Sequence, residues 1–147
     1  MTEEPIAFEV FNEIGIINQL TVTMFTQALP KGMTIAQFTV LSHFVRLQLD
    51  EKSPAALASA FQLTRATMTS TLGRMERSGL IAIRADPRDG RAKLVSLTEK
   101  GRRMRDQCVQ AIGPLVPLVE GVIPRGDLEA ILPQLREMRI ALDAMRD

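Results

Sequence analysis

Apolar residues near the start of the chain recur every three or four positions, which is the spacing of one face of an α-helix. This pattern predicts a first helix over residues 6–29, ended by a proline and a glycine. A second helix is predicted from Thr34 to about Leu49, because Thr34 and Gln37 have the spacing of a capping box. The first third of the chain is therefore expected to form two amphipathic helices.

Two shorter helices follow, each with its own start signal. Ser53 and Pro54 supply an N-cap and a proline at the first helical position, which opens a helix through Phe61. Thr64 caps the next helix, and Gly79 ends it. Three apolar residues at helical spacing form the inward face of that helix: Met68, Leu72 and Met75. Two short helices in succession predict a helix-turn-helix.

The spacing of apolar residues then changes from helical to alternating. Residues 81–85 and 94–97 each have the pattern of a short strand. The segment between them, residues 86–91, contains Asp-Pro and Asp-Gly pairs, which are typical of turns. The two strands therefore predict a β-hairpin with a basic tip.

Helical spacing returns after the hairpin. Thr98 caps a long helix, which Pro114 and Pro117 are expected to kink or interrupt. Apolar residues at helical spacing also cover residues 128–145. There we expect Pro133 to confine the regular helix to the residues that follow it.

This order of elements defines a mainly α fold with a small β-hairpin. We expect a single domain over residues 1–147, with a winged helix-turn-helix lobe at 34–100. The terminal parts, residues 1–33 and 101–147, carry long apolar stripes that so small a chain has little core to bury. We therefore predict that they form a dimer interface; ordinary packing within one monomer is the alternative.

Composition excludes several classes of protein. With 46% hydrophobic residues in 147, the chain is not fully disordered. Cys108 and His43 are the single cysteine and histidine, so no internal disulfide, metal site or cofactor is expected. The start, residues 1–5, is acidic where a signal peptide would be basic, and the most apolar stretch, residues 111–124, is too short for a membrane span. A soluble, cytoplasmic protein without a membrane partner is expected.

The net charge of +1, taken alone, argues against a nucleic-acid partner. The distribution of charge reverses that argument. Residues 63–103 contain ten basic and four acidic residues, a net of +6, whereas the flanking parts carry −3 and −2. The basic block coincides with the end of the predicted helix-turn-helix and the hairpin, where a DNA-binding protein needs positive charge.

The second helix of a helix-turn-helix can enter the major groove, and a narrow hairpin can enter the minor groove. Small hydroxyl side chains permit close approach, and arginine reaches guanine or phosphate. The candidate DNA-binding residues are Thr64, Arg65, Thr67, Thr69, Ser70, Arg74, Arg88, Arg91 and Lys93. A solvated helix with surface arginines is the alternative.

Three segments of this region resemble the MarR family of winged-helix transcriptional regulators. The segments are Met68–Ile81, Asp86–Arg91 and Val95–Gly101, which contain R-M-E-R-S-G-L-I, D-P-R-D-G-R and L-T-E-K-G. In this resemblance the helix that begins at Thr64 corresponds to the recognition helix. Asp89 and Arg91 correspond to the D-x-R of the wing, where the aspartate is expected to stabilise the wing and the arginine to enter the minor groove.

The resemblance also implies an assembly and a mode of regulation. Family members form homodimers with interlocked terminal helices and bind palindromic operators. The two recognition helices would then lie about 34 Å apart, one turn of DNA. A repressor released by a small aromatic or phenolic effector is the expected function.

Two positions depart from the expected pattern. Ile83 stands where the family commonly has arginine, with Arg84 next to it. Gly73 lies in the middle of the recognition helix, where a glycine either permits a close approach to DNA or is simply tolerated. Two other functions make different demands on the sequence. A winged-helix protein-interaction module would need an apolar outward face on the helix that begins at Thr64, and an enzyme would need a catalytic constellation that one histidine and one cysteine do not supply.

Overall fold

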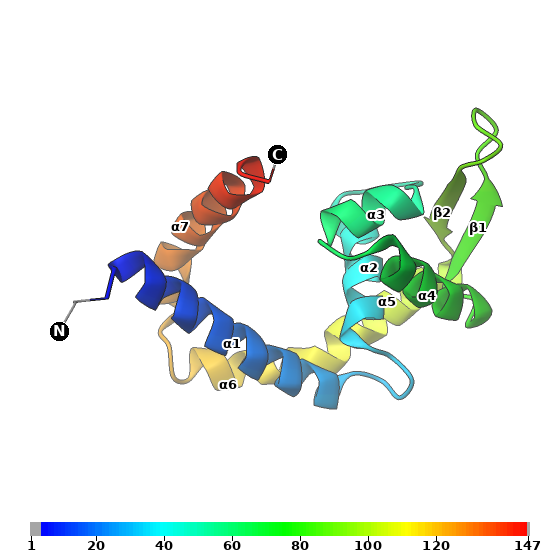
Figure 1. Cartoon of the computed structure of the whole chain (residues 1–147). Helices are drawn as coiled ribbons and strands as arrows, with labels where there is room; N and C mark the ends of the chain where they lie inside the picture. Colours follow the sequence, from blue (N-terminus) through cyan, green and yellow to red (C-terminus); the bar gives the residue numbers. More distant parts are fainter. Residues whose placement is uncertain (1–3, 147) are drawn as a thin grey trace. The chain divides into compact units, whose positions relative to one another are not determined.

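The computed structural model describes residues 4–146 and divides at Ala111 into two units, which are treated separately. The first three residues of the acidic start and the last residue of the chain lie outside the described part. The predicted order of elements is confirmed (Figure 1). The elements are α1 (Ile6–Ala28), α2 (Ile35–Arg46), α3 (Pro54–Ala60), α4 (Arg65–Arg77), β1 (Ile81–Ala85), β2 (Lys93–Leu97), α5 (Glu99–Ile112), the 3-10 turn η1 (Gly113–Leu115), α6 (Val116–Glu120) and α7 (Arg125–Ala144).

The predicted N-caps are present. Thr34 and Gln37 form a complete capping box at the start of α2, with both hydrogen bonds at 3.2 Å. The Ser53 hydroxyl accepts a hydrogen bond from the Ala56 N–H, and Pro54 occupies the first position of α3. These caps satisfy backbone donors that the first turn of a helix leaves unpaired, so they define where each helix begins.

Helices α2, α3 and α4 end in the same way. After each helix one residue adopts a left-handed conformation: Gln48 with φ 51°, Gln62 with φ 55° and Gly79 with φ 72°. The next residue then donates its N–H back across the last turn. These bonds join Leu49 N to Phe44 O, Leu63 N to Ala58 O, and Leu80 N to Met75 O, each at 2.9 Å. This is the Schellman arrangement, which reverses the chain within two residues.

The core of the first unit joins α2, α3 and α4 to the base of the hairpin. Its buried residues are Val40, Leu41, Phe44, Leu57, Ala58, Met68, Leu72, Met75, Leu80, Ile81 and Val95. The hairpin is antiparallel and pairs Ile81 with Leu97 and Ala85 with Lys93. Lys52 adds a backbone bridge to Val95, which links the α2–α3 connection to the hairpin.

The start of α5 is held by hydrogen bonds to the backbone just after α4. The Thr98 hydroxyl donates to the Gly79 carbonyl at 2.6 Å and accepts from the Gly101 N–H at 3.0 Å. A Cβ atom at Gly101 would collide with the Leu80 carbonyl oxygen. The L-T-E-K-G motif therefore has a packing function, because its threonine and glycine allow α5 to contact the backbone that follows α4.

Two predictions about prolines have different outcomes. The expected break near Pro114 and Pro117 is confirmed, since α5 ends at Ile112 and is followed by η1 and the short α6. The prediction for Pro133 is wrong, because α7 includes it and runs unbroken from Arg125 to Ala144. A proline removes one backbone donor, and helical spacing on both sides of it sustains the helix.

Large apolar residues remain exposed in both units. No residue of α1 and no residue of α7 is buried among those described. Within residues 4–146, no single helix combines the length and the apolar composition of a membrane span.

Candidate nucleic-acid interface

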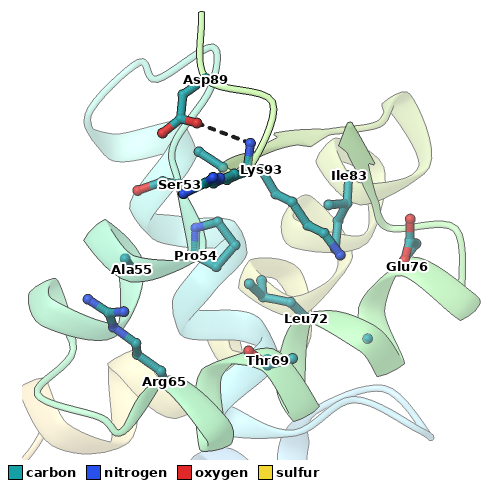
Figure 2. Close-up of a pocket in the computed structure, with 13 residues that line it drawn as sticks. Ser53, Pro54, Ala55, Arg65, Thr69, Leu72, Glu76, Ile83, Asp89 and Lys93 are labelled. Atoms are coloured by element: carbon teal, nitrogen blue, oxygen red, sulfur yellow. Dashed lines mark hydrogen bonds between the residues drawn. The ribbon is translucent and has the colours of Figure 1, made fainter. Parts of the chain in front are cut away.

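A groove of about 730 Å³ lies between α4 and the hairpin, and the start of α3 also lines it (Figure 2). Arg65 and Thr69 line it from α4, and Arg91 and Lys93 from the hairpin. The groove therefore brings basic and hydroxyl side chains from two separate elements to one surface.

Helix α4 presents these residues because its opposite face is fixed in the core. Met68, Leu72 and Met75 are buried, as their spacing predicts. The intervening positions are exposed and polar: Arg65, Thr67, Thr69, Ser70 and Arg74. An exposed polar face on a helix of 13 residues suits the major groove, which is about 12 Å wide.

Thr64 and Thr67 have a local structural role at the start of α4. The Thr64 hydroxyl accepts from the Thr67 N–H at 3.1 Å and donates to the Thr67 hydroxyl at 2.9 Å. The Thr64 hydroxyl thus caps the helix, and the Thr67 hydroxyl accepts a hydrogen bond from it. The Thr67 hydroxyl keeps its own hydrogen available as a donor.

The tip of the hairpin is held by two aspartates. The Asp86 carboxylate accepts from the Arg88 N–H at 2.9 Å, and the Asp89 carboxylate accepts from the Arg91 N–H at 3.0 Å. These are Asx turns, which hold the backbone without using the arginine side chains. The side chains of Arg88 and Arg91 are exposed and available to a partner.

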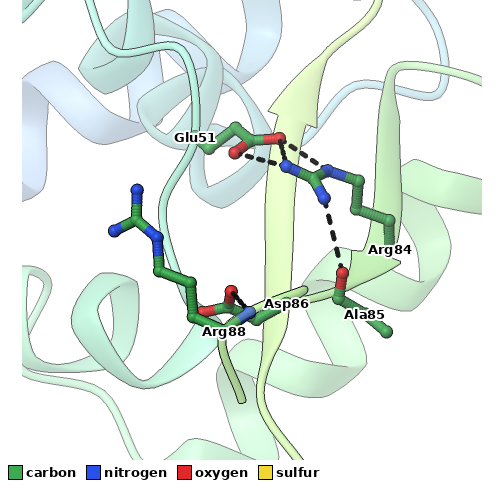
Figure 3. A network of polar contacts seen from close by, with 5 residues as sticks. All are labelled: Glu51, Arg84, Ala85, Asp86 and Arg88. Carbon is green, nitrogen blue, oxygen red and sulfur yellow. Dashed lines mark hydrogen bonds and ion pairs between the residues drawn. The ribbon is translucent and has the colours of Figure 1, made fainter. Parts of the chain in front are cut away.

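Arg84 lies outside this groove. Its guanidinium donates through Nε and Nη2 to the two carboxylate oxygens of Glu51, at 2.7 and 2.8 Å (Figure 3). The hydrogen bond to Glu51 is the main cause that raises the pKa of Arg84 above its ordinary value. Because neighbouring residues of a strand point to opposite faces, Ile83 lines the groove while Arg84 binds Glu51.

The predicted site residues fall into two groups. The groove brings together Arg65, Thr69, Asp89, Arg91 and Lys93. The others are not part of its lining and lie on α4, at its N-cap or at the hairpin tip: Thr67, Ser70, Arg74, Thr64 and Arg88. Their contacts with DNA stay predictions.

Sequence reasoning missed part of the groove. Ser53, Pro54 and Ala55 line it, although the first two were interpreted only as a helix start. Glu76 also lines it and places a carboxylate among the cations. Its position i+7 from Thr69 on the outward face of α4 was the available signal.

His43 and Cys108 are packed side chains. The His43 ring contacts Phe61 edge-on with centroids 4.9 Å apart, and burial together with Arg46 and Lys52 lowers the pKa of His43. Cys108 is buried, which raises the pKa of its thiol. Across residues 4–146, no three histidine, cysteine or carboxylate side chains gather in a way that could hold a metal ion.

Comparison with known proteins relates part of the chain to one family. The family model described as the MarR family matches residues 31–92, which include α2, α3, α4, β1 and the hairpin turn. Over residues 31–92 the chain is therefore similar to the MarR family. The relatives and solved structures that match the chain are described as transcriptional regulators.

Two curated relatives regulate transcription in opposite directions. The transcriptional activatory protein BadR of Rhodopseudomonas palustris is 35% identical over 81 residues, which are 54% of this chain and 46% of that protein. The chain therefore matches about half the length of BadR. The HTH-type transcriptional repressor NicR of Pseudomonas putida is 24% identical over 134 residues, which are 89% of this chain and 85% of that protein.

Solved structures have the same fold over nearly the whole chain. The transcriptional regulator BldR of Sulfolobus solfataricus matches with a TM-score of 0.81 and 22% identity over 96% of this chain and 99% of that one. BpsR of Bordetella bronchiseptica, whose DNA binding is regulated by 6-hydroxynicotinic acid, matches with a TM-score of 0.75 and 27% identity over 89% and 98%. A mutant MarR of E. coli complexed with operator DNA matches with a TM-score of 0.76 and 23% identity over 88% and 93%.

Proposed function

We propose that this chain binds double-stranded DNA in a sequence-specific way, as a homodimer on a palindromic operator, and represses transcription until a small aromatic effector releases it. The observation that carries this proposal is the groove between α4 and the hairpin. It presents Arg65 and Thr69 beside Arg91 and Lys93, within a segment that has a net charge of +6.

The composition of the exposed face favours DNA over a protein partner. Arg65, Thr69, Ser70 and Arg74 are all polar and all exposed on α4. A protein-binding helix face is expected to contain apolar or aromatic anchors, and this face contains none. Hydroxyl and guanidinium groups instead match the donors and acceptors of base edges and phosphates.

The terminal helices support a homodimer. Along α1 the large apolar residues are exposed, among them Ile6, Phe8, Phe11, Ile16, Ile17 and Leu20. Helix α7 likewise exposes Ile131, Leu132, Ile140 and Leu142. Apolar area on this scale indicates a subunit interface. A two-fold dimer presents two identical recognition helices, and such a pair matches a palindromic operator.

Repression and effector release rest on the relatives. NicR, a repressor, matches 89% of this chain, whereas the activatory BadR matches 54%. The DNA binding of BpsR responds to 6-hydroxynicotinic acid, a small aromatic acid. The same kind of compound is the effector class we propose for this chain.

Footprinting on the DNA upstream of the protein's own coding sequence tests the proposal. The expected result is a protected region with dyad symmetry and half-sites one helical turn apart. Protection without symmetry would overturn the palindromic operator, and no protection of any duplex would favour the protein-interaction module. A thermal-shift screen of small aromatic acids, followed by footprinting with each compound that shifts Tm, tests the effector.

A further inference from the structure

We propose that Gly73 is an affinity-determining residue of the DNA-binding surface, whose missing side chain lets α4 approach DNA closely. This inference rests on the proposed DNA binding and adds a position that charge and hydrogen-bonding capacity do not reveal. It is drawn from the place of Gly73 on α4 and from the absence of any structural need for a glycine there.

The fold does not require a glycine at this position. Gly73 lies inside α4, and a Cβ built on it would meet a single neighbouring side-chain atom, Arg77 Nη1, at an ordinary contact distance of 3.7 Å. Gly79, by contrast, has a φ of 72°, and a Cβ at Gly101 would strike the Leu80 carbonyl. Those two glycines are needed for the chain to fold as it does, whereas Gly73 has room for a side chain.

A glycine inside a helix also has a cost. It lowers helix stability relative to alanine, because glycine loses more backbone freedom on folding. Because Gly73 lowers helix stability and serves no purpose in packing, we infer that it has a function in binding DNA. The site where that function acts should then be the surface that the residue lines.

Gly73 lines the groove between α4 and the hairpin. It follows Arg65 and Thr69 at intervals of four residues, so the three positions form one row along the groove face of α4. Ile83 lines the same groove from β1. Gly73 and Ile83 are therefore uncharged positions in a lining that also contains the cations Arg65, Arg91 and Lys93 and the carboxylate of Glu76.

A side chain at position 73 would point into the space that the DNA is proposed to occupy. Without it, the α4 backbone itself can contact the DNA, and Thr69 one turn earlier can reach a base edge. A single methyl group at position 73 should weaken DNA binding. It would hold α4 farther from the floor of the DNA major groove and so lengthen the neighbouring hydrogen bonds to the bases. Gly73 therefore determines how deeply α4 enters the major groove.

The test is Gly73→Ala, measured for stability and for DNA affinity in the same preparation. We expect Tm to rise by about 3 °C, because alanine is the better helix former. We expect Kd for the operator to rise at least tenfold, and Gly73→Val to weaken binding further. Stability and affinity should thus change in opposite directions.

Ser42→Ala is the matched control. The Ser42 hydroxyl is buried on α2 without a hydrogen-bond partner among the described residues, and Ser42 does not line the groove. Alanine there should also raise Tm while leaving Kd unchanged. The control therefore shows whether a gain in protein stability by itself changes Kd, or whether the loss of affinity needs the added methyl group at position 73.

The outcomes distinguish this inference from the proposed function. Wild-type affinity in Gly73→Ala would overturn the inference and leave the proposed function intact. A fall in Tm would overturn it as well, because the glycine would then be structural. If the wild-type chain binds no duplex at all, the proposed function fails and this inference fails with it.

Discussion

Arg84 of β1 and Glu51 of the α2–α3 connection are 33 positions apart in the chain and form a two-bond ion pair at 2.7 and 2.8 Å. The pair ties the hairpin to the connection before α3, beside the backbone bridge between Lys52 and Val95. It also engages one of the ten cations of the basic segment with an internal carboxylate. Positive charge in the sequence is therefore not the same as positive charge available to DNA.

This distinction gives the first prediction. Arg91→Ala should weaken DNA binding on all sequences and reduce the slope of log K against log salt by about one, because one cation is lost from the DNA-binding surface. Arg84→Ala should leave that slope unchanged, since its guanidinium is held by Glu51. Titrations of each variant at several salt concentrations measure both slopes. Equal losses of slope in the two variants would contradict the assignment.

A second prediction concerns Thr69. Its side chain is exposed on the groove face of α4, so Thr69→Ala should change which bases are preferred and leave the salt slope nearly unaltered. Selection of operators from a random pool, with the wild type in parallel, measures the preference. An unchanged consensus would count against direct base readout by Thr69. Thr64→Ala is the comparison, because the Thr64 hydroxyl caps α4 through the Thr67 N–H and its loss should lower helix stability instead.

Gly101 provides a prediction about stability. Gly101→Ala should destabilise the protein by about 2–3 kcal/mol, because the added methyl overlaps the Leu80 carbonyl and backbone cannot yield cheaply. Chemical denaturation measures the loss. Gly90→Ala at the hairpin tip, where a Cβ meets nothing within 4 Å, should change stability far less. Similar losses in both variants would mean that the contact with Leu80 relaxes easily.

The left-handed residue after α2 gives a prediction of increased stability, in contrast to the loss expected at Gly101. Gln48 has a φ of 51°, which strains a residue with a Cβ, whereas glycine adopts it freely. Gln48→Gly should therefore stabilise the protein by up to about 1 kcal/mol. Gly79→Gln, at the equivalent position after α4, should destabilise it by a similar amount. Thermal unfolding of the two variants should show Tm moving in opposite directions.

The elements that the sequence predicted well are those governed by local rules. The capping box at Thr34, the cap at Ser53 and the hairpin turn each depend on residues within a few positions of one another. The inward face of α4 followed from spacing alone. Local hydrogen bonds and helical periodicity depend on residues that are close in the sequence, so a sequence pattern can predict them.

The rest depends on segments that meet only in the folded chain. The pair of Glu51 with Arg84 and the bridge from Lys52 to Val95 join residues more than 30 positions apart. The contribution of Ser53 to the groove depends on where α3 packs. Pro133 failed as a predictor for a different reason, because one missing hydrogen bond is a smaller effect than the helical pattern around it.

The last prediction concerns the exposed side of α1. Ile17 and Leu20 are 56% and 61% exposed in a helix with no buried residue, so they contribute little to the core of one chain. The double variant Ile17→Glu with Leu20→Glu should therefore keep its helical content and lose dimerisation, because charge at a desolvated interface is costly. Light scattering and circular dichroism measure the two properties together. The conservative pair Ile17→Leu with Leu20→Ile should remain dimeric. A glutamate variant that stays dimeric would place the interface elsewhere, and operator affinity would then be expected to survive as well.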